Sequence, residues 1–219
     1  MKAIPIATPR RQLATRYAAW PRALSRGLAG AGVKPNAVSV AGVMIGVVAS
    51  AAFVLAPALH QSGQVAALIV AAAAIQLRLL CNLLDGLLAV EEGLKERTGD
   101  VYNDLPDRVA DVVILLGAGY SIRHLAYGPA LGWAAALLAV FTAYVRLLGG
   151  SLGLTQHFVG PMAKQHRMFT LTVTSLLAAL ETFLAWPPRV MLAGLVTIVA
   201  GSFVTVVRRT LLILDEAGR

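Results

Sequence analysis

The acidic side chains of this chain gather in one short stretch. Eight of its eleven Asp and Glu residues lie between Cys81 and Asp111, and none occurs in the first 84 residues. Two asparagines, Asn82 and Asn103, stand among them. Carboxylate and amide oxygens are hard ligands, which suit Mg²⁺ or Mn²⁺. Because Mg²⁺ usually completes its shell with water and substrate phosphates, the stretch predicts a metal site for a phosphate-bearing substrate.

The first polar pair falls at the end of a predicted helix. Asn82 and Asp85 are three residues apart and therefore share a helix face. The neighbouring Gly86 and Ala89 are small, which would let a ligand approach the backbone. An ionisable residue near membrane depth indicates function by default. Asp85 at a helix end would equally suit a simple ion pair, and both interpretations stand at this point.

The second group falls at the start of the next predicted helix. Asn103, Asp107 and Asp111 recur every four residues and share a face. Acids in a first helical turn complement the helix dipole, and Pro106 is tolerated there. Such capping would account for Asp104 and leaves Asp111, one turn deeper, unexplained. Where the two helix ends meet, the four groups Asn82, Asp85, Asn103 and Asp107 would converge on a cation.

The composition indicates an integral membrane protein. The chain is 58% hydrophobic, and its mean hydropathy is +0.72. Its net charge of +8 suits anionic lipid headgroups, whereas nucleic-acid binding would need a solvated basic surface that so apolar a chain lacks. Cys81 is the single cysteine, so an internal disulfide is impossible.

Six segments are long and apolar enough to span a bilayer. They cover residues 37–58, 64–89, 105–124, 129–152, 167–186 and 189–213. We therefore expect an all-α integral membrane protein with six transmembrane helices in one domain, residues 35–214. A basic segment, residues 1–34, precedes this domain, and a short tail, residues 215–219, follows it.

Lys and Arg residues predict the orientation of the chain. They concentrate before the first span, in the acidic stretch and beside the fifth span, which places both termini and the acidic stretch in the cytoplasm. Within residues 8–30, arginines alternate with apolar and aromatic side chains, including Tyr17 and Trp20. This pattern favours an amphipathic interfacial helix, interrupted at Pro21, over a disordered basic tail.

The spacing of the polar residues is specific. From Asn82 to Asp107 the chain spells N-x2-D-G-x2-A-V-x8-G-x3-N-x3-D. This resembles the signature of the CDP-alcohol phosphatidyltransferases, D-x2-D-G-x2-A-R-x8-G-x3-D-x3-D, with every interval matched. The identical positions are Asp85, Gly86, Ala89, Gly99 and Asp107. A register ending on Asp111 instead would break the Gly99 interval. The six spans and the segment KPNAVSVAG, residues 34–42, also resemble that family.

The resemblance implies a metal-dependent transfer in phospholipid biosynthesis. A phosphatidyl group would move from CDP-diacylglycerol, or a similar CDP-activated lipid, to an acceptor hydroxyl, and CMP would leave. It implies metal ligation by Asn82, Asp85, Asn103 and Asp107, with Asp107 as the general base. The nucleotide-binding positions implied are Pro35, Asn36, Ser39, Asn82, Asp85, Gly86, Ala89 and Gly99. It further implies a homodimer, and we expect the bacterial inner membrane as its location.

Three positions depart from the family signature. Asn82 and Asn103 replace aspartates, and Val90 replaces an arginine. The four ligand positions would carry −4 as four aspartates and carry −2 here, so metal affinity should fall. Asp104 or Asp111 could compensate. The alternative function is a catalytically weak lipid- or nucleotide-binding homologue that keeps the fold. A small transporter is a further alternative, but its polar groups would gather at the membrane midplane.

A second cluster of charges is basic. Lys164 and Arg167 are three apart at the start of the fifth span, and Arg146 lies in the cytoplasmic half of the fourth. The pair is also what positive-inside flanking would produce. Arg146 is not explained in that way, so we expect the three to bind a phosphate or an anionic acceptor. The acceptor would be a small polar or phosphorylated alcohol.

Overall fold

The computed structural model describes residues 19–218. Seven α-helices account for most of this part of the chain, which contains no strand. They are α1 (Ala19–Gly30), α2 (Pro35–Leu55), α3 (Gln61–Val90), α4 (Gly99–Ser121), α5 (Gly128–Ser151), α6 (Lys164–Phe183) and α7 (Val190–Ala217). A short 3₁₀ turn, η2 (Ala56–Ala58), joins α2 to α3.

The all-helical fold is confirmed, and each of the six predicted segments overlaps one of the helices α2 to α7. Among the described residues, four helices are long and apolar enough to cross a membrane: α2 extended through η2, α3, α5 and α7. These apolar helices indicate a membrane protein. Because α4 and α6 carry several charged residues, the count of six spans stays a prediction.

The start of α4 differs from the prediction. The helix begins at Gly99, so Pro106 lies inside it and not in its first turn. The carbonyl of Thr98 accepts the backbone N–H groups of Val101 and Tyr102 at 3.0 and 3.1 Å, which starts the helix early. Because Pro106 has no N–H, the Tyr102 carbonyl lacks its usual helical donor.

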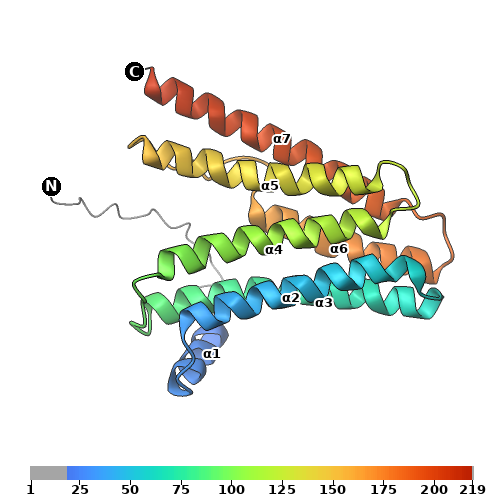
Figure 1. Cartoon of the computed structure of the whole chain (residues 1–219), viewed down its shortest axis with the longest axis horizontal. Coiled ribbons are helices and arrows are strands. Elements are labelled where there is room, and N and C mark those ends of the chain that lie inside the picture. The colour runs from blue at the N-terminus through green and yellow to red at the C-terminus, as the bar shows by residue number, and fades with distance from the viewer. Residues whose placement is uncertain (1–18, 219) are drawn as a thin grey trace.

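The long helices form a bundle in which α2 packs along α3 and α4, α3 along α6, and α5 along α4 and α7 (Figure 1). Small residues let α4 approach its neighbours closely. A Cβ added at Gly117 would lie 2.7 Å from the Ser50 Cα, and one at Gly119 would lie 2.6 Å from the Gly132 Cα. Side chains at these positions would force the helices apart, as at other close helix crossings in membranes.

Large apolar side chains cover the outside of the bundle. Met44 on α2, Leu137 on α5 and Phe203 on α7 are each about 60% exposed, and many others are similar. Exposed apolar area on this scale is rare in soluble monomers and suits contact with lipid. The interior is filled by apolar side chains, among them the fully buried Phe53 and Ile75.

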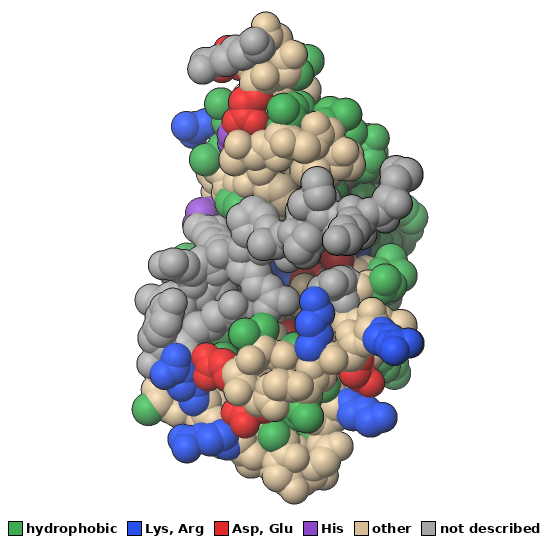
Figure 2. Space-filling view, turned by 90° about the vertical axis from the view of Figure 1, so that its left-hand side faces the viewer, with side chains coloured by type: hydrophobic (Ala, Val, Ile, Leu, Met, Phe, Trp, Pro, Cys, Tyr) green, Lys and Arg blue, Asp and Glu red, His purple; other side chains and the backbone are tan. Residues whose placement is uncertain are grey.

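Charged side chains concentrate at one end of the bundle, where α3 ends and α4 begins. This end faces the viewer in Figure 2, with blue and red side chains over its lower part. Helix α1 lies beside it, and Arg22 pairs with Glu91 at 3.2 Å. Pro21 lies within the described part of α1, and the predicted interruption of the helix at this residue stays a prediction. The predicted interfacial residues before Ala19 lie outside the described part.

The connection from α5 to α6 folds back into the bundle. Gly160 has a φ of +124°, which favours glycine, and the Met162 N–H donates to the Thr205 hydroxyl at 3.0 Å. Arg209 donates through Nε to the Val159 carbonyl at 2.9 Å. Because α7 holds this connection, α6 begins at Lys164 well inside the bundle rather than at its charged end (Figure 1).

Candidate functional site

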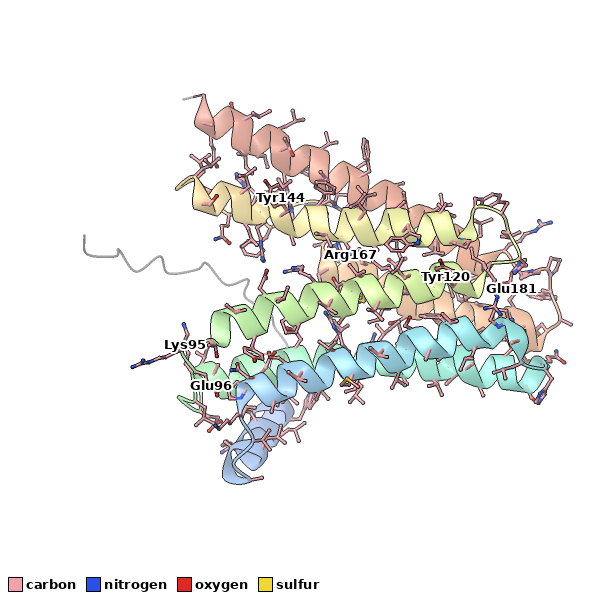
Figure 3. All side chains as sticks on the ribbon, in the orientation of Figure 1. Lys95, Glu96, Tyr120, Tyr144, Arg167 and Glu181 are labelled. Atoms are coloured by element: carbon pink, nitrogen blue, oxygen red, sulfur yellow. The ribbon has the colours of Figure 1, made fainter. Side chains whose placement is uncertain are left out.

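Most of the predicted nucleotide-binding residues line one hollow between α2, α3 and α4. Its walls are formed by Pro35, Asn36, Ser39, Asp85, Gly86, Ala89, Lys95, Glu96, Gly99 and Asn103. Every residue of the predicted nucleotide set except Asn82 belongs to this wall. Lys95 and Glu96 were not predicted, and they lie at the charged end of the bundle (Figure 3). The only sequence signal for them is their position in the acidic stretch just before Gly99.

A second hollow adjoins the first and shares Ser39 and Asp85 with it. Its other walls are Gly42, Val43, Arg78, Cys81, Asn82, Tyr102, Pro106, Asp107 and Ala110. The four predicted metal ligands are therefore divided. Asn103 faces the first hollow, Asn82 and Asp107 face the second, and Asp85 lies between them.

Asp85 is a buried carboxylate with one oxygen bound and one unbound. It is 5% exposed, and its Oδ2 accepts a hydrogen bond from the Ser39 hydroxyl at 2.6 Å. Its Oδ1 is buried and has no hydrogen-bond partner among the described residues. An unpaired buried carboxylate oxygen is costly, so this atom is suited to a cation or to a donor from a ligand.

Asp107 is surrounded by donors. Arg78 reaches its Oδ1 at 3.1 Å, and the Lys164 ammonium is in direct contact with its Oδ2. The Asn82 amide fits between these groups when its nitrogen donates to both Asp107 oxygens at 3.2 Å and its oxygen accepts from Lys164 Nζ at 2.6 Å. Both oxygens of Asp107 are therefore engaged, unlike those of Asp85.

Asp111 lies deeper in the bundle, between two arginines. Its carboxylate is 2.8 Å from Arg78 Nη2 and 3.2 Å from Arg167 Nη2, and all three side chains are at most 2% exposed. Arg167 also donates to the Thr142 hydroxyl and to the Met162 carbonyl, each at 3.1 Å. Figure 3 places Arg167 near the middle of the bundle, far from the end where Glu181 lies.

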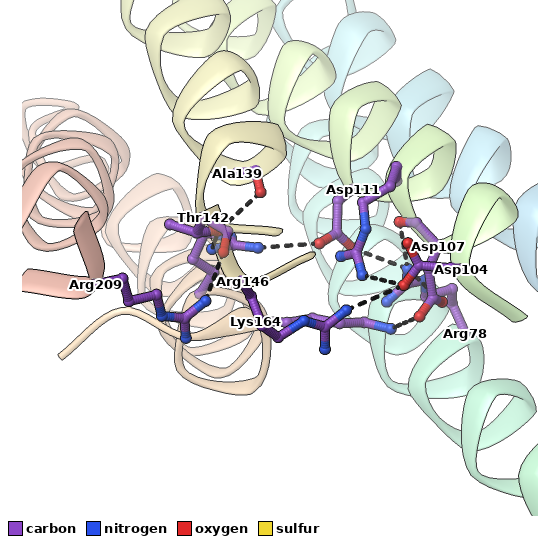
Figure 4. Close-up of polar contacts among 11 residues, drawn as sticks. Arg78, Asp104, Asp107, Asp111, Ala139, Thr142, Arg146, Lys164 and Arg209 are labelled. Carbon is purple, nitrogen blue, oxygen red and sulfur yellow. Dashed lines mark hydrogen bonds and ion pairs between the residues drawn. The ribbon is translucent and has the colours of Figure 1, made fainter. Parts of the chain in front are cut away.

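Asp104 pairs with two further arginines. Its Oδ1 accepts from Arg108 at 2.7 Å and from Arg146 at 3.2 Å, and the Arg146 guanidinium lies 5.3 Å from the centre of the Phe158 ring. Figure 4 shows Asp104 and Arg146 beside Asp107 and Asp111. The two acids predicted to compensate for the asparagines, Asp104 and Asp111, therefore both lie in ion pairs with arginine.

The whole cluster carries an excess of positive charge. Arg78, Arg108, Arg146, Lys164 and Arg167 contribute +5, and Asp104, Asp107 and Asp111 contribute −3, which leaves +2. Adding Asp85 leaves +1. An anion beside this cluster would complete its charge balance. Arg78 and Arg108 were not among the predicted site residues, although an arginine inside an apolar helix is itself a sequence signal for a buried partner.

The donor set fits one divalent cation better than two. Within the described residues, no three Asp, Glu, His or Cys side chains come together as a metal site. Asp85 Oδ1 is free to bind an ion, and the Asn103 amide lies on the same hollow. At Asp107 the carboxylate is already neutralised by Arg78 and Lys164. A hard cation that completes its shell with phosphate oxygens suits the Asp85 side of the site.

Comparison with solved structures identifies the fold. The chain matches the phosphatidylinositol phosphate synthase PgsA1 of Mycobacterium tuberculosis in complex with manganese and citrate, with a TM-score of 0.74 and 20% identity over 89% of this chain and 88% of that one. It has the fold of that synthase. The complex with CDP-DAG matches with a TM-score of 0.74 and 20% identity over 90% and 94% of the two chains. The apo form matches at 0.70 and 21% over 85% and 92%.

That synthase is a CDP-alcohol phosphatidyltransferase, so the resemblance seen in residues 82–107 is confirmed at the level of the fold. No protein-family model matches this chain, and a search of curated proteins finds no match. At 20–21% identity the structural likeness concerns the fold, and the chemistry has to be argued from the residues.

Proposed function

We propose that this chain is a metal-dependent phosphatidyltransferase. It would move a phosphatidyl group from a CDP-activated lipid, CDP-diacylglycerol, to an acceptor hydroxyl and release CMP. The observation that carries the proposal is the first hollow, where seven of the eight motif-implied nucleotide positions meet on three helices. Support comes from the neighbouring synthase structures, one of which holds CDP-DAG and another manganese.

The residues of the two hollows suggest a division of labour. Gly86, Ala89 and Gly99 lack bulk and would admit the nucleotide close to the backbone. Asp85 and Asn103 would hold Mg²⁺ or Mn²⁺, which when bound would neutralise charge on the pyrophosphate. The negatively charged pyrophosphate, with its metal ion, would therefore lie in the hollow beside Asp85.

Asp107 is the proposed general base. The acceptor oxygen would bond to the phosphorus nearer the lipid, the bond from that phosphorus to the CMP oxygen would break, and Asp107 would take the hydroxyl proton. Arg78 and Lys164 hold the carboxylate in place.

The acceptor is proposed to be phosphorylated. The net +2 of the acid–base cluster, concentrated around Arg108, Arg146, Lys164 and Arg167, favours an anion. Arg146 and Arg108 are each about 20% exposed, so they can reach a ligand while Asp104 anchors them. A neutral alcohol would leave the excess charge unbalanced.

One observation favours the second candidate, a nucleotide- or lipid-binding homologue without turnover. Both oxygens of Asp107 are already engaged by Arg78 and Lys164, and two of the four ligand positions are amides. Such a protein would bind CDP-diacylglycerol in the first hollow and release no CMP.

CMP release from CDP-diacylglycerol decides between these candidates. The purified chain in lipid nanodiscs should release CMP with Mn²⁺ or Mg²⁺ and one member of an acceptor panel, and EDTA should stop the release. Loss of a general base typically costs 10²–10⁴-fold, so Asp107→Asn should lower the rate by about that factor. Glu92→Gln, an acid-to-amide change in the same stretch but outside both hollows, is the matched control. Nucleotide binding without CMP release would contradict the transferase proposal and support a binding homologue without turnover.

We also propose that α4 and α6 cross the membrane, which gives six spans within residues 35–214. Asp107 and Asp111 on α4 pair with Lys164 and Arg167 on α6 inside the bundle. Leu105 on α4 and Phe169 on α6, in contrast, are at least 60% exposed. Outward faces of this kind suit lipid. The charged end would face the cytoplasm of a bacterial inner membrane, with α1 at the interface, where Trp20 is 59% exposed. The homodimer remains an expectation. The number of spans and their orientation can be tested by labelling single engineered cysteines from each side of the membrane. Cys81→Ser gives the cysteine-free background for this experiment.

A further inference from the structure

We infer that the Lys164 ammonium is a resident cation that takes the place of a second divalent ion. The inference rests on the proposed function, because it concerns the metal that this function would use. In this arrangement Lys164 is the cation that contacts Asn82 and Asp107, the first and last motif positions. One divalent ion would then bind at Asp85. Lys164 would thus be part of the permanent charge balance of the site.

The contacts of Lys164 place its charge between the two motif ends. Its Nζ is in direct contact with Asp107 Oδ2 and, with the Asn82 amide in its satisfied orientation, lies 2.6 Å from the Asn82 oxygen. An oxygen from each motif end thus faces one ammonium. Two oxygen ligands directed at one positive charge are what a bound cation would present, and here a side chain fills that position.

The charge at Asn82 matches this arrangement. With Asn82, Asp107 and Lys164 the local sum is zero, and Arg78 adds a further +1 through its contact with Asp107. An aspartate at position 82 would bring a second carboxylate toward Asp107, and Lys164 alone would not balance the two. With asparagine at position 82, Lys164 alone balances Asp107, so the residue at position 82 and the lysine are explained together.

The backbone holds Lys164 in this position. It is the first residue of α6, which begins inside the bundle because the preceding connection is bound to α7 through the Met162–Thr205 hydrogen bond. Three residues later, Arg167 is fixed by Asp111. The Lys164 side chain is 19% exposed, so its charge is mostly shielded from solvent and is directed at Asp107. A divalent ion would have to displace it.

Asp85 offers the contrasting position. Its Oδ1 has no partner among the described residues, and no cationic side chain forms an ion pair with it there. A single Mn²⁺ would therefore bind on the Asp85 side, and the Asp107 side would stay closed to metal while Lys164 contacts Asp107.

The test is the number of Mn²⁺ ions per chain, counted by the EPR signal of free Mn²⁺ during titration of the full chain in nanodiscs. The wild type should bind one ion. Asn82→Asp/Lys164→Met should bind two, because it restores a carboxylate and removes the ammonium. Asn82→Asp/Lys164→Arg, the matched control with the same new carboxylate and the charge retained, should bind one.

Two outcomes would overturn the inference: two ions in the wild type, or equal counts in the two double variants. If the variant with Lys164→Met proves unstable in gel filtration, the number of Mn²⁺ ions bound by the wild type still tests the inference. CMP release is not needed for the count, so failure of the proposed transfer and failure of this inference are distinguishable. Loss of turnover with a difference of one ion between the variants would reject only the transfer.

Discussion

The buried ion pair between Asp111 and Arg167 makes a sharp prediction about stability. Asp111→Asn leaves the Arg167 guanidinium, 1% exposed, without the only acid that it contacts among the described residues. At the observed 3.2 Å and an effective dielectric constant near 20, the lost attraction is about 5 kcal/mol. Measured losses on breaking one side of a buried pair are about 3–5 kcal/mol, so we expect that range.

The assay is thermal unfolding of the purified chain, followed by fluorescence-detected gel filtration. At roughly 2–4 °C per kcal/mol for a chain of this size, Asp111→Asn should lower the melting temperature by on the order of 10 °C. Glu92→Gln, at the surface of the same stretch, should change it little. The double variant Asp111→Leu/Arg167→Met removes both charges and leaves Arg78 its partner Asp107, so it should recover much of the loss.

The double variant separates an electrostatic cause from a packing cause. If the orphaned charge is responsible, the two substitutions together cost less than the sum of the single substitutions. A melting temperature of Asp111→Asn close to that of the wild type, or a double variant as unstable as that sum, would show that the pair does not stabilise the fold as argued.

Two further predictions concern the connection before α6 and the first hollow. Gly160→Ala would place a Cβ 2.8 Å from the Thr205 hydroxyl at a positive φ, so it should destabilise the fold by about 1–3 kcal/mol. The measurement is a lower melting temperature, and a melting temperature equal to that of the wild type would contradict the described contact. Asn103→Asp adds a carboxylate to the hollow that Asp85 lines and should tighten Mn²⁺ binding about tenfold, ~1.4 kcal/mol, in calorimetric titration. Unchanged affinity would place the ion away from Asn103.

The helices were largely predictable because their apolar runs are long and are separated by polar or Gly- and Pro-containing breaks. The starts of α4 and α6 were not. Both begin earlier than predicted, at Gly99 and Lys164, in polar sequence that hydropathy excludes from a span. In each case the polar residues are helical because partners within the bundle pair with them, which is tertiary information absent from a hydropathy pattern.

The site divides in the same way. The resemblance to the family signature predicted that Asp85 and Gly99 would contribute to one binding site, and both line the first hollow although they lie on different helices. The resemblance could not predict that Lys164 would reach Asp107, 57 positions earlier, or that Arg167 would reach Asp111, 56 positions earlier. Those contacts depend on how deeply α6 begins, and the connection bound to α7 sets that depth.

The balance of buried positive and negative charges within the bundle links these observations. A buried cation needs a partner, so Arg78 and Arg167 inside apolar helices already require acids nearby. Asp107 and Asp111 meet that requirement, which means that Asp107, the last acid of the motif, stabilises the fold as well as forming the site. Asp85 differs from them, because among the described residues it forms no ion pair and its hydrogen-bond donor is the Ser39 hydroxyl. The carboxylate left without a counter-charge is therefore the one available to bind a metal ion, and the asparagine at position 82 is a consequence of the lysine that already balances Asp107.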